Sequence, residues 1–383
     1  MNILHISPYV PSVHASHAGG VCMGKQVETL SKRHNVYVMG FINDDKDEIL
    51  AKEYDENKSY FVKSTTLTKS INALLHLNIP LMFGIRNSLS FKRKIVKVIQ
   101  EYNIDCIHAE FTAMGQYYYL KKKFPNLKFN LVEHDVAIQS YERKNSDSFL
   151  GKILDKWQLS LVKKIEKEYV QNADVVFVTN EKDKILINNR YGITDAHVII
   201  PYYGIDTFGP QGNKKETNSI CFVGNMSRIE NDLAAKRLIN IFNDMKLENS
   251  KLYIIGAYPS KELQAMSSDN IIVTGFVEKI EDIIDKCEIA VFPLDYGAGI
   301  KLKVLLAFGL GLPVITTDIG AEGIDEDGEV LMLVNTDEQI KNSILQLINN
   351  KDFYNNKSKD SIKYVKKHFG WEKTESLFEK IYH

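Results

Sequence analysis

The residues with the clearest chemical potential lie in the segment 290–324, where Lys301 and Lys303 follow a turn that contains Gly297 and Gly299. An apolar run precedes the turn, and a second apolar run follows the lysine-bearing segment, which has helical spacing. Backbone N–H groups at a helix start are unpaired and favour an anion, and nearby lysines strengthen that preference. We interpret the pattern as a seat for a diphosphate group, although it also fits an ordinary βαβ turn with two surface lysines.

A polar triplet, Glu133, His134 and Asp135, ends another apolar run in the stretch LVEHDV. The carboxyl end of a strand is where an α/β sheet places its working residues. There His134 can donate a hydrogen bond to a substrate hydroxyl or brace a leaving group. A structural histidine in a connecting loop is the alternative interpretation.

Three further glycine turns follow apolar runs in the same way. The loop HAGGV at residues 17–21 follows the first expected strand, and its glycines allow the backbone to approach a ligand closely. The stretch FVGNMSRIEN, residues 222–231, repeats the phosphate-seat pattern with Arg228 as its fixed positive charge. In TGFVEKIEDII, residues 274–284, the backbone near Val277 can meet the edge of a nucleobase. Each of the three also fits a plain turn without a ligand.

The segment FKRKIVKVIQ, residues 91–100, places basic residues before an apolar stripe at Ile95, Val98 and Ile99. Such a helix can contact anionic lipid. We favour the simpler interpretation, in which the charged residues form a solvated helix face.

The bulk composition is that of a globular protein with two domains. At 383 residues the chain is too long for one ordinary core, and its hydrophobic content of 44% and charged content of 25% are typical globular values. The net charge of −1 gives no general preference for nucleic acid. No apolar stretch reaches the ~18 residues of a membrane span, and the first residues lack a signal-peptide pattern. Four widely spaced cysteines argue against a metal or redox site and favour reduced thiols in a cytosolic protein: Cys22, Cys106, Cys221 and Cys287.

Apolar runs and helical patterns alternate along the chain, which predicts parallel sheets with helices on both faces. A polar, glycine-bearing stretch at 204–218 separates two such series and is the expected domain boundary. We expect a glycine turn at 18–21 followed by a helix at 26–33, a long amphipathic helix within 149–171 and a closing helix at 372–381. The expected strands lie at residues 2–7, 36–41, 104–109, 129–133 and 175–179 in the first series and at 220–223, 252–255, 271–274, 289–292 and 314–317 in the second, with 329–334 as a candidate last strand.

Taken in order, these pieces resemble the retaining glycosyltransferases of family 4, which have the GT-B fold. The matching phrases are AGGV, VEHDV, the connector VIIPYYGIDTF, FVGNMSRIENDLAA, YGAGIKLKVLLAFGLGLPVITTDIGAEGI and the closing HFGWEKTESLFEKIY. The resemblance implies an α/β protein with two facing Rossmann-like, doubly wound domains. Residues 1–205 are then the acceptor domain, residues 206–365 the nucleotide-sugar domain, and residues 366–383 a C-terminal helix that crosses back to the first domain.

The resemblance further implies a retaining, metal-independent, hexosyltransferase-type enzyme. It moves a sugar from a nucleotide-sugar donor, a UDP-sugar in preference to a GDP-sugar, to a glycan, lipid-linked or protein acceptor. We expect a role in cell-surface polysaccharide or glycoconjugate synthesis, no cofactor, no nucleic-acid partner, and a cytoplasmic location that includes peripheral contact with the inner face of the membrane. Two alternatives stay open: a catalytically inactive GT-B subunit that binds a glycan, a protein or a partner transferase, and a sugar-nucleotide epimerase on the same fold.

By carry-over from the family, His134 and Asp135 are the candidate catalytic residues, and no metal ligands are expected. The candidate residues for binding the donor or the acceptor are Gly19, Gly20, Gly224, Asn225, Arg228, Asn231, Val277, Gly299, Ile300, Lys301 and Lys303.

The sequence departs from the family pattern at four positions. Ala298 and Leu306 stand where the family commonly has two glutamates, one for the donor sugar and one for the ribose. Asn225 and Asn231 stand where the family has an arginine and a lysine. Losing one charge-assisted hydrogen bond costs on the order of 1.5–3 kcal/mol. The cations that can restore the phosphate charge are Lys301, Lys303 and Arg228.

Overall fold

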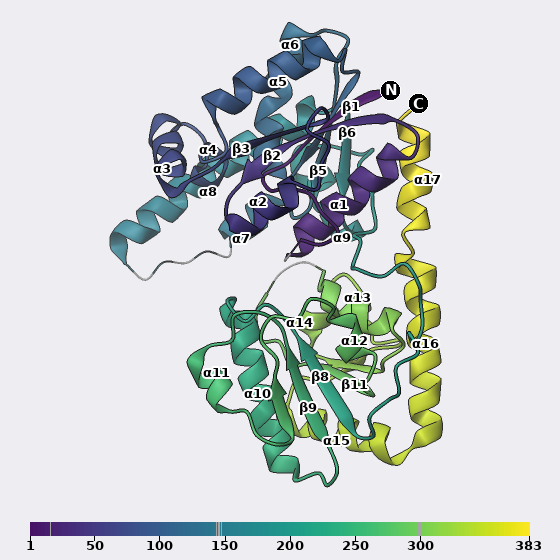
Figure 1. Ribbon diagram of the computed structural model, residues 1–383. Coiled ribbons are helices and arrows are strands. Elements are labelled where there is room, and N and C mark those ends of the chain that lie inside the picture. The colour runs from purple at the N-terminus through teal and green to yellow at the C-terminus, as the bar shows by residue number, and fades with distance from the viewer. Residues whose placement is uncertain (16, 143, 145, 147, 298–299) are drawn as a thin grey trace. The chain divides into compact units, whose positions relative to one another are not determined.

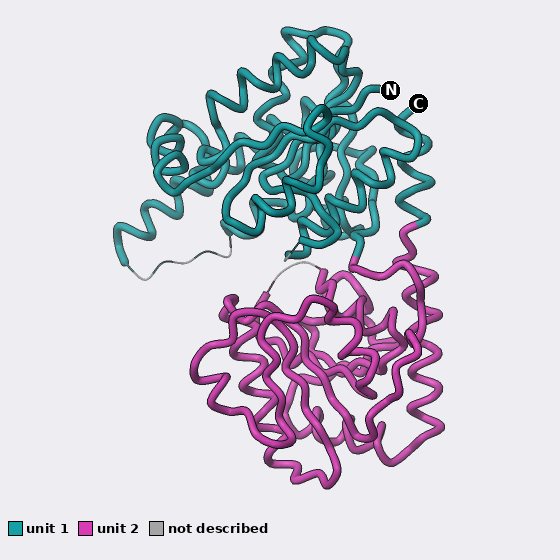
Figure 2. Tube along the Cα trace, in the orientation of Figure 1, with its two compact units in different colours: residues 1–202, 372–383 teal, residues 203–371 magenta. Residues whose placement is uncertain are grey.

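The chain folds into two compact units, each built around one parallel sheet (Figure 1). The computed structural model describes every residue except 16, 143, 145, 147, 298 and 299. Unit 1 comprises Met1–Tyr202 and Glu372–His383, and unit 2 comprises Tyr203–Trp371 (Figure 2). The chain therefore leaves unit 1 for unit 2 and returns to it at the C-terminal end.

Unit 1 contains a seven-stranded sheet in the order β3-β2-β1-β4-β5-β6-β7. Strand β1 pairs in parallel with β2 on one side and β4 on the other, so that Ile3 lies between Val36 and Cys106. The strand order reverses between β1 and β4, which is the switch point of a doubly wound sheet. The strands are β1 (Asn2–Ile6), β2 (Asn35–Ile42), β3 (Ser59–Lys63), β4 (Cys106–Glu110), β5 (Lys128–Glu133), β6 (Val175–Val178) and β7 (His197–Val198).

Helices connect these strands and cover both faces of the sheet. They are α1 (Ala18–Ser31), α2 (Asp45–Ala51), α3 (Thr66–Leu75), α4 (Leu81–Gly84), α5 (Leu89–Glu101), the 3₁₀ helix η1 (Thr112–Tyr119), α6 (Leu120–Lys123), α7 (Ala137–Glu142), α8 (Phe149–Asn172), α9 (Glu181–Tyr191) and the C-terminal α17 (Glu372–Ile381).

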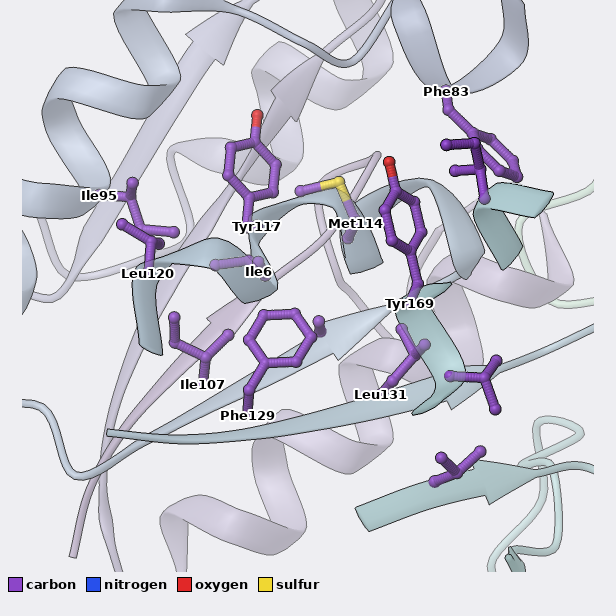
Figure 3. Close-up of a cluster of buried hydrophobic side chains, with 14 of the residues drawn as sticks. Ile6, Phe83, Ile95, Ile107, Met114, Tyr117, Leu120, Phe129, Leu131 and Tyr169 are labelled. Atoms are coloured by element: carbon purple, nitrogen blue, oxygen red, sulfur yellow. The ribbon is translucent and has the colours of Figure 1, made fainter. Parts of the chain in front are cut away.

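Alternation of side chains along the strands of unit 1 supplies two apolar clusters. Leu4 and Ile6 belong to the cluster that includes residues of α5, η1 and α8, part of which is drawn in Figure 3. Ile3, which directly precedes Leu4, belongs to the other cluster, with residues of α1 and α17 such as Phe378. Because both faces of the sheet are covered, the central strands are largely apolar, and the polar residues within them, such as His5, His108 and Glu110, are buried as well.

Unit 2 contains a six-stranded parallel sheet in the order β10-β9-β8-β11-β12-β13. Its strands are β8 (Ser219–Val223), β9 (Lys251–Ile255), β10 (Ile271–Val273), β11 (Ile289–Phe292), β12 (Val314–Thr316) and β13 (Met332–Leu333). Its helices are α10 (Ile229–Met245), α11 (Lys261–Ala265), α12 (Glu281–Ile284), α13 (Leu302–Gly309), α14 (Asp318–Ala321), α15 (Asp337–Asn349) and α16 (Lys351–Phe369). The strand order again reverses once, between β8 and β11, as in unit 1.

The expected strands are present, with ends shifted by a few residues at most, but two strands and one helix start were not expected. Strands β3 and β7 lie at the edges of the sheet, and β7 has only two residues, so neither carries a continuous buried apolar run. The expected turn at 18–21 is wrong, because these residues form the first turn of α1. The helix begins there because Nδ1 of His17 accepts a hydrogen bond from the backbone N–H of Gly20 at 3.0 Å. Imidazole is not among the common N-cap side chains, so the pattern of usual caps does not reveal this start.

Candidate functional site

The loop that follows β5 is the candidate site of unit 1. Strand β5 ends at Glu133, so His134 and Asp135 stand at the carboxyl end of a central strand, as the sequence pattern indicated. The side chain of His134 is 9% exposed, and Asp135 is exposed. The Thr179 hydroxyl, just after β6, donates to the backbone carbonyl of His134 at 3.0 Å. The neighbouring strand end thus holds the loop in place.

A buried carboxylate, Glu110 at the end of β4, lies directly beside His134. Its Oε2 is 2.6 Å from Nε2 of His134, while its Oε1 is 3.0 Å from Nε2 of His5 and 3.1 Å from Nε2 of His108. An ionised carboxylate only accepts hydrogen bonds, so each of these three Nε2 atoms carries a proton. His134 is therefore held through Nε2–H, and Nδ1 is the ring atom left to act as base or, once protonated, as donor.

The same hydrogen-bond network continues from Glu110 through His108 to Tyr382, just after the C-terminal helix α17. Nε2 of His108 is also 2.9 Å from Oε1 of Gln26 on α1, and Nδ1 of His108 accepts from the Tyr382 hydroxyl. Sequence reasoning did not select Glu110, His5 or His108. The signal was present, because the run CIHAE ends in polar residues at the carboxyl end of a strand, as LVEHDV does.

Hydrogen bonding keeps Glu110 ionised in spite of its complete burial. Burial opposes ionisation, but the hydrogen bond from His108 and the charge and hydrogen bond of His134 outweigh it and hold the pKa of Glu110 well below its usual range. Burial is the main reason why the pKa of His5 is lowered. One ligand atom each from His5, His108 and Glu110 lie within 4.8 Å of one another. These atoms already hydrogen-bond one another, so we interpret the cluster as a proton-holding network that orients His134.

The plane of the His134 ring is fixed by Phe111, which in turn is given space by Gly19. Phe111 stacks on it with ring centroids 4.1 Å apart and planes 16° apart. The backbone of Phe111 has φ 67°, an unusual value for a bulky residue. A Cβ at position 19 would lie 2.9 Å from Cζ of Phe111, so Gly19 provides the space for this ring. Gly19 therefore supports His134 through Phe111, and its contact with a ligand stays a prediction.

Gly20, the second glycine of that loop, has a capping role in the structure. Its N–H donates to the His17 ring, and a Cβ there would lie 2.4 Å from Cβ of Ala15. The contact of Gly20 with phosphate or acceptor stays a prediction.

Two further carboxyl groups, those of Glu133 and Glu166, lie next to this loop. Burial raises the pKa of Glu133 well above its usual range, and the charge of Glu166 adds to this. The Thr112 hydroxyl donates to Glu133. Burial also raises the pKa of Glu166 to about 7, against the hydrogen bonds that Glu166 accepts from Tyr191 and from two backbone N–H groups at the start of α7. Near neutral pH Glu133 therefore favours its protonated form, and Glu166 is close to the midpoint of its titration.

In unit 2, the structure brings Lys303 and Asn231 together. Nζ of Lys303 donates to Oδ1 of Asn231 at 2.6 Å and lies 4.8 Å and 5.7 Å from the ring centroids of Phe222 and Phe292. Burial lowers the pKa of Lys303 to about 7, and the positive charge of Lys301 adds to this. Nζ of Lys303, from α13, thus lies beside Asn231, the sequence position on α10 where the resemblance implies a lysine.

Lys301 lies at the start of α13, in the N-cap position. Its side chain is 11% exposed, and its Nζ is 3.8 Å from Oε2 of Glu322. Ile300, just before it, is half-buried. Gly299 and the glutamate-replacing Ala298 lie outside the described residues. The expectation that the backbone here holds a diphosphate therefore stays a prediction.

The glycine turn after β8 is held by Asn231. Nδ2 of Asn231 donates to the backbone carbonyl of Asn225 at 2.8 Å, so the side chain links this turn to Lys303. A Cβ at position 224 would lie 2.9 Å from Cγ of Asn231, which explains why Gly224 is small. Gly224, Asn225, Asn231 and Lys303 therefore form one contiguous group at the carboxyl ends of the strands.

Two other predicted binding residues, Arg228 and Val277, lie outside this group of contacts. Arg228 is the N-cap residue of α10, and its side chain is 72% exposed and 3.6 Å from Oε1 of Glu230. Val277 is half-buried in the loop after β10. Of the two positions where the family has glutamates, Leu306 is buried inside α13 at 4% exposure. A nearby carboxylate, Asp295, is paired with Arg237 at 2.9 Å.

Two family models match the chain in successive stretches. Residues 25–207 match the family described as Glycosyltransferase Family 4, and residues 217–350 match the family described as Glycosyl transferases group 1. An uncharacterized glycosyltransferase of Methanocaldococcus jannaschii is 25% identical to this chain over 295 residues, which is 71% of each protein.

Solved structures share the fold along the whole chain. The structure of HepE of Anabaena in complex with UDP has a TM-score of 0.72 at 13% identity, and the match covers 100% of this chain and 99% of the HepE chain. The pneumococcal O-GlcNAc transferase GtfA in complex with UDP and GlcNAc has a TM-score of 0.67 at 13% identity, with the same coverage. At such identities these likenesses show the fold alone.

The two parallel-sheet units have the GT-B fold of these solved structures. The two family matches, one in each part of the chain, support a glycosyltransferase. Within the described residues, no helix combines the length and the apolar character that a membrane crossing needs.

Proposed function

We propose that this glycosyltransferase moves a sugar from a UDP-sugar to a glycan, lipid-linked or protein acceptor, with retention of the anomeric configuration and without a metal. The observation that carries the proposal is the Lys303 ammonium at the carboxyl ends of the unit 2 strands, on Asn231. This amino group is already in place where an α/β sheet binds its ligands, and it gains its full charge when an anion binds. Relatives of the same fold whose structures contain UDP support the choice of nucleotide.

Sugar transfer builds negative charge on the departing diphosphate as the anomeric C–O bond breaks. Lys303, Lys301 and backbone N–H groups at the start of α13 would stabilise that charge. Lys303 is set in advance by Asn231 and two aromatic rings, so little reorganisation is needed when the charge develops. Because Asn225 and Asn231 replace the family's arginine and lysine, the side-chain positive charge would come from these two lysines, with Arg228 as a third candidate.

His134 would serve the sugar side of the reaction. With Nε2–H fixed on Glu110, Nδ1 can accept from a sugar hydroxyl, or donate to an oxygen when the ring is protonated. We place Asp135, which is exposed beside it, as the second candidate for acceptor contact.

We also propose a cytoplasmic location. All four cysteines are buried free thiols, which suits a reducing compartment.

An inactive, ligand-binding subunit is the second candidate function. The observation in its favour is Leu306, whose burial in α13 leaves that family glutamate position without a carboxylate. In this case the fold would bind a glycan or a partner transferase and catalyse nothing.

A panel of sugar nucleotides tests the proposal in two stages. A ligand that binds the folded state alone raises thermal stability, so we expect at least one UDP-sugar to raise the melting temperature, and to do so less in Lys303→Met. Incubation of that donor with acceptors of the three classes should then release UDP. Stabilisation without release under every acceptor condition would favour the inactive subunit, and no stabilisation by any nucleotide would contradict the donor assignment.

A further inference from the structure

Helix α3 in unit 1 has an apolar face that the protein itself does not cover. Leu67, Ile71, Leu74 and Leu75 repeat at the spacing of one helix face, and all four are exposed, Leu74 and Leu75 by 71% and 72%. None of the residues of α3, all of which the structure describes, is buried. A ten-residue helix of this kind gains little from its own propensity, so its apolar face needs a partner environment.

The first turns of α8 extend the same surface. Phe149, Leu150, Ile153 and Leu154 are exposed, and buried residues of α8 begin only at Asp155. In Figure 1, α3 and the start of α8 extend from the same side of unit 1.

Helix α4 joins the two helices. It packs against α3, and its first N–H, that of Leu81, donates to Oε1 of Gln158 on α8 at 2.8 Å. We call the exposed apolar residues of α3 and of the first two turns of α8 the apolar face. Contiguous exposed apolar patches of this kind mark contact with a protein or a membrane.

The segments that carry the apolar face contain more basic than acidic residues, although Asp44 and Asp47 of the neighbouring α2 region act on Lys69 and Arg86 is buried. Residues 64–100 contain six basic residues and no aspartate or glutamate, in a chain whose net charge is −1. In α8, residues 149–164 contain four lysines and one acid, Asp155, which is itself 3.1 Å from Lys144. Helix α5 contributes charge alone, because its apolar stripe of Ile95, Val98 and Ile99 is buried in the core.

From this arrangement we infer that the apolar face docks unit 1 onto a bilayer rich in anionic phospholipid. Exposed leucine and phenylalanine side chains enter the region between headgroups and acyl chains, while the surrounding lysines and arginines meet negative headgroups. A second copy of the chain fits less well. A two-fold contact would place the same basic residues of both copies against each other. The inference concerns unit 1 and does not depend on nucleotide binding in unit 2.

Vesicle cosedimentation tests this inference directly. The full chain is mixed at low salt with vesicles of phosphatidylcholine and phosphatidylglycerol, or of phosphatidylcholine alone. We expect binding to the mixed vesicles that is at least about tenfold stronger than to the neutral ones and that weakens as salt is added.

Two sets of variants separate the apolar and the charged contributions. The fourfold variant Leu74→Ser, Leu75→Ser, Phe149→Ser and Leu150→Ser should bind mixed vesicles at least about tenfold more weakly. Its matched control, Ile49→Ser with Ile185→Ser, changes side chains that are 62% and 58% exposed elsewhere on unit 1 and should bind like wild type.

The charge variant replaces four exposed basic residues of unit 1, Arg93, Lys97, Lys152 and Lys156, by glutamine. It should lose the preference for phosphatidylglycerol. Its control replaces four exposed lysines of α16 by glutamine, at positions 359, 363, 366 and 367, and should keep that preference.

Thermal unfolding shows whether each variant is folded, and the charge variant still decides the question if the serine variant is not. Absence of wild-type binding to mixed vesicles would overturn the inference, as would equal binding by the folded serine variant. A concentration-dependent dimer in solution that the serine changes abolish, without vesicle binding, would assign the face to a second copy instead.

Discussion

Binding of a nucleotide sugar to unit 2 should take up a proton, because Lys303 has a pKa of about 7 in the free protein, mainly through burial. The ordinary value is 10.5. A diphosphate next to the ammonium would favour its charged form and return the pKa toward the ordinary value. The lysine would then be about half protonated at pH 7 before binding and almost fully protonated after it.

The size of the effect follows from these two pKa values. Uptake should be about 0.1 proton at pH 6, about 0.5 at pH 7 and about 0.9 at pH 8. By linkage, affinity falls as the pH rises above 7 and approaches a tenfold loss per unit, or about 1.4 kcal/mol. A nucleotide sugar is the right ligand, because its diphosphate ester does not titrate in this range.

Isothermal titration calorimetry in buffers of different ionisation enthalpy measures the uptake. Lys303→Arg is the matched control, because arginine stays protonated at every pH used, so binding should continue without proton uptake. Lys303→Met should weaken binding and also abolish uptake. Wild-type binding with uptake near zero at pH 8 would refute the reasoning, because either the lysine is ordinary in the free protein or the diphosphate does not reach it.

Three further predictions concern unit 1. Glu110→Gln places an amide among three imidazole N–H donors, so it should lower the free energy of unfolding by about 1–3 kcal/mol and lower turnover at least about tenfold. Chemical denaturation measures the first effect and product release the second. Unchanged turnover in the folded variant would show that Glu110 does not position His134. Gly19→Ala should lower the free energy of unfolding by about 1–3 kcal/mol, because the new Cβ meets Phe111. Its control, Gly84→Ala, should be near neutral, because its Cβ would meet its nearest neighbours at 3.6 Å. Equal effects of the two changes in denaturant melts would contradict the packing argument. Glu166 has a folded pKa of about 7, raised by burial above the ordinary 4.5, so its contribution to stability is fully present at low pH and falls as the pH rises from about 4.5 through 7. In urea melts at several pH values, Glu166→Gln should flatten this decline in the free energy of unfolding. If the wild-type value instead rises over the same pH range in parallel with that of the variant, the raised pKa of Glu166 is contradicted.

Much of the fold could be predicted because both sheets are built from buried parallel strands. The run AVF before Pro293 is apolar over its whole length and proline marks its end, and the run FNLV before Glu133 is mostly apolar and ends in a polar triplet. The edge strands β3 and β7 could not be predicted in this way, because they are half-exposed and, for β7, only two residues long. The start of α1 was missed because the cap is a histidine ring.

The candidate site shows where pattern reasoning ends. The strand-end rule selected His134, and the glycine turn followed by a helix start selected Lys301 and Lys303. It could not show that Glu110, from another strand, holds His134, nor that Lys303 crosses to Asn231 on α10. Both contacts join residues far apart in the chain, and such pairs are set by packing. Gly19 shows the converse, since a glycine expected beside a ligand gives space to Phe111.

The most direct test of the central claim is a crystal structure of the chain with a non-transferable UDP-sugar analogue. The account predicts the diphosphate at the start of α13, with Nζ of Lys303 within about 3 Å of a phosphate oxygen. A diphosphate bound away from α13, with Lys303 still directed at Asn231 and without phosphate contact, would contradict it.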